Sequence, residues 1–412
     1  MTKLALLGGT PVRAGKPPIP TWPIFDESDV QMVAEAVRGG VWGGFPEPGR
    51  YASQLAAEMA RIHTAKHAIC MANGTITLMI ALQAAGVGWG DEVIIPGYTF
   101  AATGWAPLAV GAIPVFVDID PQTYCISPAA IEAAITPRTR AIIPVHVGCC
   151  LADMDAIMQI SYRHNLIVVE DAAHAHSAKW NNRGAGSLGH FGSFSLQSTK
   201  TLTTGEGGIL LTNDDALAEA CHSLIDCGRP KDPRGTRFRF GANFRMGELQ
   251  CALGVAQIRR LETQTQVRAE NMAYLGEALS EIPGVHPLQP YPQTTVRPTY
   301  RYIFKIEPEA FAGITNARFC EALTAEGIHA WRGWDPMYHY DLFRPTPETS
   351  PVVRNFPDHF RFEHMHLPEI ERASTREAVW LDMEYFLGDH ALMDDIVEAV
   401  HKIQVHAHEL SA

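Results

Sequence analysis

The sequence lacks an apolar run long enough to cross a bilayer, and its first ten residues hold too short an apolar stretch for a secretory signal. We therefore expect a cytoplasmic protein without a membrane partner. It also lacks a stripe of basic residues, since 33 Lys and Arg stand against 45 Asp and Glu, for a formal net charge of -12. Nucleic-acid binding rests on clustered Lys and Arg. No nucleic-acid partner is expected, and anionic small molecules must be bound locally.

Cysteine pairs of the kind that bind zinc are lacking too. The eight cysteines are scattered without a C-x-x-C pair, and the neighbours Cys149 and Cys150 cannot easily bridge each other. We expect reduced thiols, as is usual in a cytoplasm, and no metal site.

The chain does have a regular alternation of strand-like and helix-like segments. The helical patterns lie at 75–85, 128–135, 154–164 and 214–224, and between them lie short apolar runs at 67–73, 92–96, 114–118, 141–147, 166–170 and 209–212. Strands that are apolar throughout are typical of a mostly parallel sheet covered on both faces. We therefore predict an α/β fold with a mostly parallel central sheet flanked by helices.

The length of 412 residues favours two domains. We predict an N-terminal arm over residues 1–25, a large domain over 26–260 and a small C-terminal α+β domain over 261–412, with a long helix pair or one bent helix near 247–278. In the small domain the patterns predict a strand at 300–306, a loop at 331–361, and helices at 316–326, 374–386 and 391–405.

Ligands of such sheets bind beyond the carboxyl ends of the parallel strands. Gly74 and Thr75 follow the first strand and open a helix, whose free N–H groups could hold a phosphate. A simple helix cap is the alternative. Phe100 follows the next strand and could stack on a planar cofactor, although a core phenylalanine would give the same pattern.

Asp171 and His174 come at the end of a buried strand. Burial of Asp171 requires a cation or a donor beside it, unless it is only a helix N-cap. Lys200 lies in a Gly-rich turn between strand-like segments at 193–196 and 208–211. A lysine held near a packed sheet has a lowered pKa and becomes a nucleophilic amine, whereas a solvated loop lysine is the alternative.

Together these residues are the parts needed to hold pyridoxal 5′-phosphate. Lys200 would form a Schiff base with the cofactor aldehyde, and Asp171 would keep the pyridine nitrogen protonated. Ser195 lies on the strand that leads back to Lys200, where its hydroxyl could reach the phosphate.

Four motifs carry a resemblance to a known family: EDAAH at 170–174, GSFS at 192–195, Lys200 followed by TGEGG at 204–208, and GANFRM at 241–246. Over nearly the whole chain the sequence resembles the DegT-type sugar aminotransferases of pyridoxal-phosphate fold type I. The resemblance implies that Thr75, Ser195 and Asn243 bind the phosphate, that Phe100 stacks on the ring and that His174 lies near the Lys200 side. It also implies a homodimer with a shared active site, because Asn243 would reach in from the partner subunit.

Further motifs, HAHSAKW at 174–180, FSLQSTK at 194–200, GGTP at 8–11 and MYHYDLF at 337–343, look most like the branch of L-glutamine:scyllo-inosose and 2-deoxy-scyllo-inosose aminotransferases of aminoglycoside-type antibiotic biosynthesis. Leu196 and Thr199 depart mildly from the family pattern. We expect an amino group to pass from L-glutamine, or L-glutamate, to a keto-cyclitol or keto-sugar. The residues available in loops to bind a polyol are Tyr338, His339, Trp42 and Arg332.

Three alternatives stay open. One is a nucleotide-linked keto-sugar acceptor, whose diphosphate could be held by the arginines of the 229–239 loop. Another is an enzyme like 3-amino-5-hydroxybenzoate synthase, which shares much of the pattern. The non-enzymatic alternative is an effector-binding protein on the same fold, disfavoured because no basic helix-turn-helix segment precedes residue 26.

Overall fold

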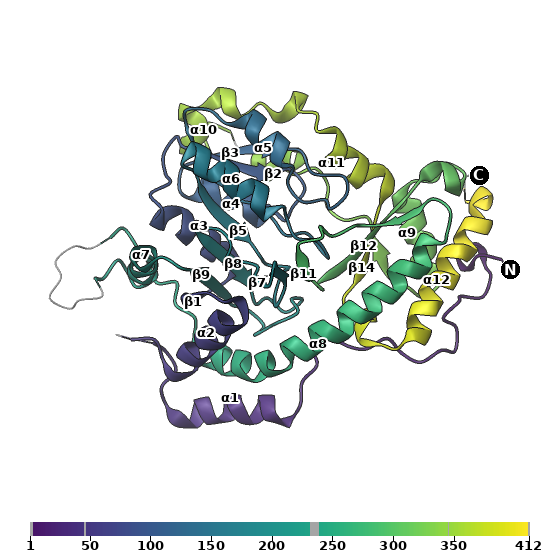
Figure 1. Cartoon of the computed structure of the whole chain (residues 1–412), viewed down its shortest axis with the longest axis horizontal. Coiled ribbons are helices and arrows are strands. Elements are labelled where there is room, and N and C mark those ends of the chain that lie inside the picture. Colours follow the sequence, from purple (N-terminus) through teal and green to yellow (C-terminus); the bar gives the residue numbers. More distant parts are fainter. Residues whose placement is uncertain (1–2, 45–46, 231–238, 345, 411–412) are drawn as a thin grey trace.

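A seven-stranded sheet forms the centre of the large part of the chain. The computed structural model describes residues 3–44, 47–230, 239–344 and 346–410 (Figure 1). The strand order is β1-β9-β8-β5-β4-β2-β3. The strands are β1 (His67–Met71), β2 (Glu92–Pro96), β3 (Ile113–Val117), β4 (Thr139–Ile142), β5 (Ile167–Asp171), β8 (Phe191–Ser195) and β9 (Gly208–Thr212).

The central sheet is parallel except for β9, which pairs antiparallel with both β8 and β1. Consecutive residues of one strand pack on opposite faces of the sheet, in two separate cores. Val168 packs in the same core as Ile94, whereas Val169 packs in the same core as Val93. Burial on both faces explains the continuous apolar runs in these strands. The predicted α/β fold with a mostly parallel sheet is confirmed.

Helices cover both faces of this sheet (Figure 1). One face packs against α3, α4 and α7, and the other against α2, α5, α6 and the first part of α8. The bounds are α1 (Glu27–Gly39), α2 (Arg50–His63), α3 (Gly74–Ala84), α4 (Ala101–Ala109), α5 (Pro128–Ala134), α6 (Met154–His164) and α7 (Asp215–Ile225). The helix α4 was not predicted, because Gly104 and Pro107 interrupt its helical pattern.

The predicted long helical stretch near 247–278 is one helix, α8 (Glu248–Ser280). Its first part packs against α1 and α2, and its later part contacts α12 and β10, so that α8 runs along both parts of the molecule (Figure 1). The predicted boundary between residues 260 and 261 falls inside this helix. The division into an arm, a large domain and a small domain stays a prediction.

A second, antiparallel sheet follows α8, in the order β10-β12-β14-β13. Its strands are β10 (Val285–Pro287), β12 (Arg301–Ile306), β13 (Ala330–Trp331) and β14 (Ala378–Asp382), and the helices of this part are α9 (Asn316–Ala325), α10 (Pro351–Asn355), α11 (Pro368–Arg372) and α12 (His390–Val405). A small third sheet joins β11 (Thr294–Val296) to β6 (Lys179–Trp180) and β7 (Arg183–Gly184). The described helices include none that is both long enough and apolar enough to span a bilayer.

The predicted helix at 374–386 is wrong. A π-helical turn at Ala373–Glu377 leads into the strand β14, and a 3-10 turn follows at Tyr385–Leu387. The residues Ala378, Val379, Trp380 and Leu381 are all fully buried. A short apolar run of this kind fits a buried strand as well as a helix, and only its pairing with β12 decides between them.

Candidate active site

Asp171 ends β5 and is 7% exposed. Its Oδ2 accepts a hydrogen bond from the Thr103 hydroxyl at 2.8 Å, and its Oδ1 accepts one from the backbone N–H of Ala173 at 3.3 Å. Burial raises the pKa of Asp171, although the Thr103 bond and the charge of Lys200 act in the opposite direction. Asp171 is therefore a buried carboxyl group that accepts a hydrogen bond from the Thr103 side chain.

Lys200 lies in the turn after β8, where its backbone N–H donates a hydrogen bond to the carbonyl of Gln197 at 2.9 Å. Its Nζ lies 4.2 Å from the centroid of the Tyr300 ring. Burial lowers the pKa of Lys200, and both Tyr300 and Asp171 act to raise it. Because the charge of Asp171 acts on the Lys200 amine, the turn brings the lysine back towards the end of β5. The indole N–H of Trp22, near the chain's start, bonds the carbonyl of Ser198 at 3.1 Å and so packs the N-terminal segment on this turn.

His174 is 5% exposed and lies between two aromatic rings. Its ring centroid is 4.2 Å from that of Tyr300 and 5.7 Å from that of Trp334, with which it is stacked at 19°. Burial lowers the pKa of His174 well below its usual range, and the charge of Lys200 lowers it further. Its Nδ1 accepts a hydrogen bond from the N–H of Gly148 at 3.2 Å, so the neutral ring carries its proton on Nε2.

The start of α3 is held against the end of β8. A Cβ added to Gly74 would lie 2.8 Å from the Cβ of Ser195, so only glycine allows this approach. Asn73 caps α3, taking the N–H of Ile76 on its side chain and that of Thr77 on its carbonyl. The N–H groups at the first positions, Gly74 and Thr75, are the ones that a helix N-terminus leaves to an outside anion.

Phe100 and Asn243 are both exposed. Phe100 precedes α4, three residues before Thr103, and 61% of its surface is exposed. Asn243 bridges to Asp226, and its side chain accepts a hydrogen bond from the N–H of Arg245 at 3.3 Å. Neither residue contacts Lys200 within the described chain. Their roles toward a ring and a phosphate stay predictions.

The four residues predicted to bind a polyol do not gather at Lys200. Tyr338 is fully buried, and its hydroxyl donates to Glu371 at 3.0 Å. The indole N–H of Trp42 donates to the carbonyl of Val37, Arg332 pairs with Asp335 at 2.7 Å, and His339 is exposed beside Tyr338. No contact in the described segments ties any of the four to Lys200 or Asp171, so their role as substrate residues stays a prediction.

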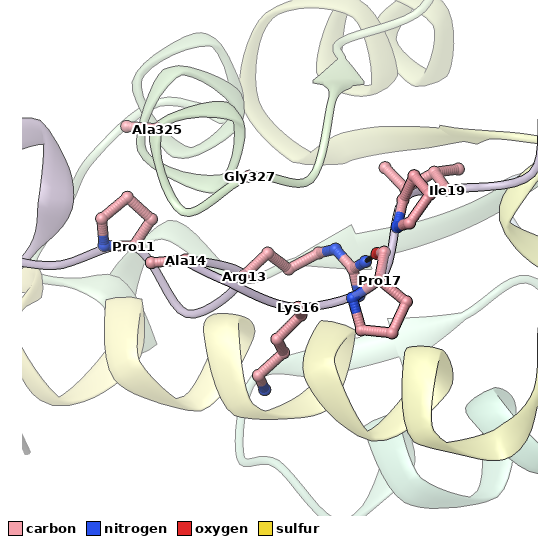
Figure 2. Close-up of a pocket in the computed structure, with 9 residues that line it drawn as sticks. Pro11, Arg13, Ala14, Lys16, Pro17, Ile19, Ala325 and Gly327 are labelled. Atoms are coloured by element: carbon pink, nitrogen blue, oxygen red, sulfur yellow. Dashed lines mark hydrogen bonds between the residues drawn. The ribbon is translucent and has the colours of Figure 1, made fainter.

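A surface pocket of about 340 Å³ lies apart from this cluster, along the N-terminal segment and the end of α9 (Figure 2). The side chain of Lys16 points to α12, where it pairs with Asp395, and Arg13 pairs with the same carboxylate. Because both of the pocket's cationic side chains are already paired with a carboxylate, this pocket is not a candidate anion site.

Three residues of the cluster were missed by sequence reasoning. Thr103 lies on the unpredicted helix α4, and Tyr300 and Trp334 lie in the part after residue 261, far from Lys200 in sequence. Aromatic residues are common in cores. Tyr300 and Trp334 differ from other core aromatic residues only because the folded chain brings them to the end of β5. Tyr300 is the first residue of the strand predicted at 300–306, and this was the only sequence signal available for it.

These groups match the chemical demands of pyridoxal 5′-phosphate. A buried carboxyl group at Asp171 suits a protonated pyridine nitrogen, and an amine of lowered pKa at Lys200 suits attack on an aldehyde. The close packing of Gly74 against Ser195, together with the hydroxyls of Thr75 and Ser195, suits a phosphate. The residues present therefore fit this group.

The DegT/DnrJ/EryC1/StrS aminotransferase family model matches residues 23–379. A protein of Streptoalloteichus tenebrarius, provisionally named L-glutamine:3-amino-2,3-dideoxy-scyllo-inosose aminotransferase, is 41% identical over 98% of both chains. The L-glutamine:2-deoxy-scyllo-inosose aminotransferase of Micromonospora echinospora is 36% identical over 100% of both. The crystal structure of 3-amino-5-hydroxybenzoic acid synthase aligns with a TM-score of 0.83 and 32% identity, over 94% of this chain and 98% of the other.

An aminotransferase from Psychrobacter cryohalolentis aligns with a TM-score of 0.84 and 28% identity, over 95% of this chain and all of the other. The family match covers every strand of the central sheet and every residue of the cluster around Lys200, and it ends within β14. The chain therefore belongs to the DegT/DnrJ/EryC1/StrS aminotransferase family, and it is an enzyme that uses pyridoxal 5′-phosphate.

Proposed function

We propose that the enzyme transfers the amino group of L-glutamine, or L-glutamate, to a keto-cyclitol such as scyllo-inosose or 2-deoxy-scyllo-inosose, in the biosynthesis of an aminoglycoside-type antibiotic. One observation carries this proposal. Relatives between 35% and 41% identical, aligned over nearly all of this chain, bear the names of L-glutamine:inosose aminotransferases. Among these acceptors are amino-substituted and deoxy forms, which makes a keto-cyclitol the shared chemical class.

The bound cofactor would supply an electron-accepting pyridine ring that makes the α-hydrogen of an amino acid acidic. Asp171 would hold the proton on the ring nitrogen, which its buried position and the Thr103 bond prepare it to do. Gly74, Thr75 and Ser195 would hold the phosphate, and Phe100 would cover one face of the ring. Lys200 would anchor the aldehyde carbon and, once released, take up and return a proton at Nζ.

His174 acts as a neutral group in this proposal. Its Nδ1 accepts the Gly148 N–H, and its ring lies between Tyr300 and Trp334. A neutral imidazole next to Lys200 adds no positive charge that would oppose protonation of the amine.

A neutral polyol agrees with the charges near the cluster. Arg301, beside Tyr300, forms an ion pair with Asp382, and Arg332 pairs with Asp335 at 2.7 Å. An arginine already paired with a carboxylate has little remaining attraction for a diphosphate. A keto-cyclitol needs hydrogen bonds rather than net positive charge.

A nucleotide-linked keto-sugar is the second candidate acceptor. The structure of DesI in the presence of its TDP-sugar product aligns with a TM-score of 0.81 and 28% identity. The arginine loop expected to hold a diphosphate is described only in part. Arg229 pairs with Asp226 at 3.0 Å, whereas Lys231, Arg234 and Arg237 lie outside the described residues. Formation of 3-amino-5-hydroxybenzoate is a third possibility, favoured by the similarity to its synthase.

A homodimer with a shared active site is part of the proposal. Asn243 is exposed, and its neighbour Phe240 is 96% exposed. A large exposed aromatic residue next to a predicted phosphate ligand supports contact with a second copy of the chain.

A substrate panel tests the acceptor. The purified enzyme is given L-glutamine with scyllo-inosose, 2-deoxy-scyllo-inosose, 3-amino-2,3-dideoxy-scyllo-inosose or a dTDP-linked keto-hexose, and amine products are measured by mass spectrometry. We expect kcat/KM for at least one free cyclitol to exceed that for the nucleotide sugar by roughly 100-fold or more. Turnover of the nucleotide sugar alone contradicts the proposal.

The lysine assignment has its own test. The protein loaded with pyridoxal 5′-phosphate is expected to show a visible absorption band that Lys200→Ala removes. Lys66→Ala is the matched control, because Lys66 is an exposed lysine paired with Asp215. Loss of the band in the control, or its survival in Lys200→Ala, contradicts the assignment.

A further inference from the structure

The face of one aromatic ring lies next to the amine of Lys200. Nζ is 4.2 Å from the centroid of the Tyr300 ring, and Tyr300 is only 7% exposed. At this distance a protonated amine is attracted by the negative face of an aromatic ring, and burial strengthens that attraction.

Three contacts hold the Tyr300 ring in place. Its hydroxyl and that of Thr199, the residue before Lys200, share a hydrogen bond of 3.0 Å. The His174 ring centroid is 4.2 Å away, and the Arg301 guanidinium carbon is 4.7 Å from the Tyr300 centroid. Arg301 is itself fixed by its ion pair with Asp382. The ring is therefore a rigid surface beside a flexible lysine side chain.

We propose that Tyr300 is a positioning residue, whose ring face holds the Lys200 amine in place whenever that amine is not covalently bound. This inference rests on the proposed function of Lys200 as the group that takes up and returns a proton. In each half-reaction Nζ gains one proton and gives it up again, so Lys200 ends unchanged. Between these two events it is an ammonium group, which is the form that the ring attracts.

The charged and titratable groups around Nζ set its proton affinity. Asp171 and Tyr300 act to raise the pKa of Lys200, whereas burial, the largest influence, and the charge of Arg301 lower it. The two buried histidines nearby, His174 and His176, are neutral because burial lowers the pKa of each. The Tyr300 hydroxyl contributes to this rise, and the ring face beside Nζ adds its own attraction for the ammonium group. Loss of the whole side chain is therefore expected to lower the pKa of Lys200 more than loss of the hydroxyl alone.

Two substitutions of Tyr300 separate the ring from the hydroxyl. Tyr300→Phe keeps the ring and loses the bond to Thr199, whereas Tyr300→Leu loses both. Tyr302→Leu is the matched control, since Tyr302 lies two residues further along the chain, in β12, and packs on Phe386 with a ring centroid distance of 5.3 Å. Removal of that ring creates a similar cavity without changing the surroundings of Nζ.

The first readout needs no substrate. The cofactor-free protein is labelled with trace acetic anhydride across a pH series, and the acetylation of Lys200 is quantified by mass spectrometry against exposed Lys66 in the same sample. We expect Tyr300→Leu to lower the apparent pKa of Lys200 by about one unit, Tyr300→Phe to lower it by less than half as much, and Tyr302→Leu to leave it within about 0.3 unit. The second readout is the rate of amine transfer. Tyr300→Leu should lower kcat roughly tenfold with little change in KM, whereas Tyr300→Phe should keep most of the wild-type kcat.

An unchanged pKa of Lys200 in Tyr300→Leu overturns the proposal, and so does an equal fall in Tyr300→Phe, which would assign the effect to the hydroxyl. A fall in Tyr302→Leu as large as in Tyr300→Leu also overturns it, because the cause would then be general loosening of the strand. The labelling result is independent of the acceptor. A wrong choice of keto-cyclitol therefore leaves it standing, and a negative labelling result leaves the proposed function intact.

Discussion

The hydroxyl of Thr103 donates a 2.8 Å hydrogen bond to Oδ2 of Asp171, and this bond joins α4 to the end of β5. Burial raises the pKa of Asp171, and the bond from Thr103 counteracts that rise by stabilising the ionised carboxylate. Thr103 in turn lies 2.9 Å from the hydroxyl of Thr99, which fixes its orientation. A buried carboxylate that has to remain charged depends on such a donor.

Replacement of this donor is expected to raise the pKa of Asp171 further. In Thr103→Val the acid limb of the kcat/KM profile should move to higher pH by up to about one unit, because more alkaline conditions are needed to ionise the carboxyl group. The Kd for pyridoxal 5′-phosphate should rise about tenfold, as for loss of a hydrogen bond to a charged group. Thr375→Val is the control, because Thr375 is an exposed threonine whose hydroxyl donates to the carbonyl of Glu371. Identical profiles for the two variants would show that Thr103 does not tune Asp171.

A second prediction concerns the affinity for pyridoxal 5′-phosphate and follows from the close approach of α3 to β8. In Gly74→Ala the new Cβ would meet the Cβ of Ser195 at 2.8 Å and must push the start of α3 away from the strand. We expect the Kd for pyridoxal 5′-phosphate, measured by fluorescence titration, to rise tenfold or more. Gly39→Ala is the matched control, since that helix-end glycine has no atom within 4 Å of its added Cβ. Unchanged affinity in Gly74→Ala would show that the start of α3 does not hold the phosphate.

The shared active site can be tested by mixing two inactive variants. Lys200→Ala removes the amine, and Asn243→Asp places a negative charge where a phosphate ligand is predicted. If Asn243 serves the partner's site, each hybrid dimer has one site with both defects and one with neither. Random reassociation of equal amounts then restores roughly 25% of wild-type activity. Absence of recovery in dimers shown to have exchanged subunits means that Asn243 acts within its own chain, and full activity of Asn243→Asp by itself means that it has no role.

The burial of His63 is expected to make the free energy of unfolding depend on pH. His63 is fully buried, its Nδ1 donates to the carbonyl of Ala185 at 2.7 Å, and its Nε2 accepts the N–H of Ser177 at 3.2 Å. Burial lowers the pKa of His63 to about 4. Below pH 6.5 the unfolded chain takes up a proton at this residue that the folded chain does not. The free energy of unfolding should therefore fall by about 1.4 kcal/mol per pH unit between pH 6.5 and 4 on account of His63.

Denaturant unfolding at pH 7.5 and pH 5.5 measures this contribution. His63→Asn lowers stability at both values, but the difference between the two should shrink relative to the wild type. His164→Asn is the control, because His164 is a partly exposed histidine beside Glu132. A wild-type pH dependence that survives unchanged in His63→Asn contradicts the assignment of the effect to this residue.

Several elements were predictable because local pattern and tertiary context agree in them. The strand predicted at 92–96 and the helix predicted at 154–164 have these bounds in the structure. In both cases an apolar run or an amphipathic pattern ends at a recognisable boundary, such as the Asp153 cap that accepts the N–H of Ala156. The segment at 378–382 had no such boundary, and its strand pairing decided its conformation.

The amino-acid sequence was enough to predict the α/β fold, the family, and the candidates Asp171 and Lys200, because strand ends and motif spacing are local features. The surroundings of those two residues depend on contacts between distant segments. Thr103 comes from a helix with an interrupted pattern, and Tyr300 comes from a segment 100 residues after Lys200 (300 − 200 = 100). Contacts between such distant segments depend on how the two sheets pack, and packing is a property of the folded chain rather than of any stretch within it.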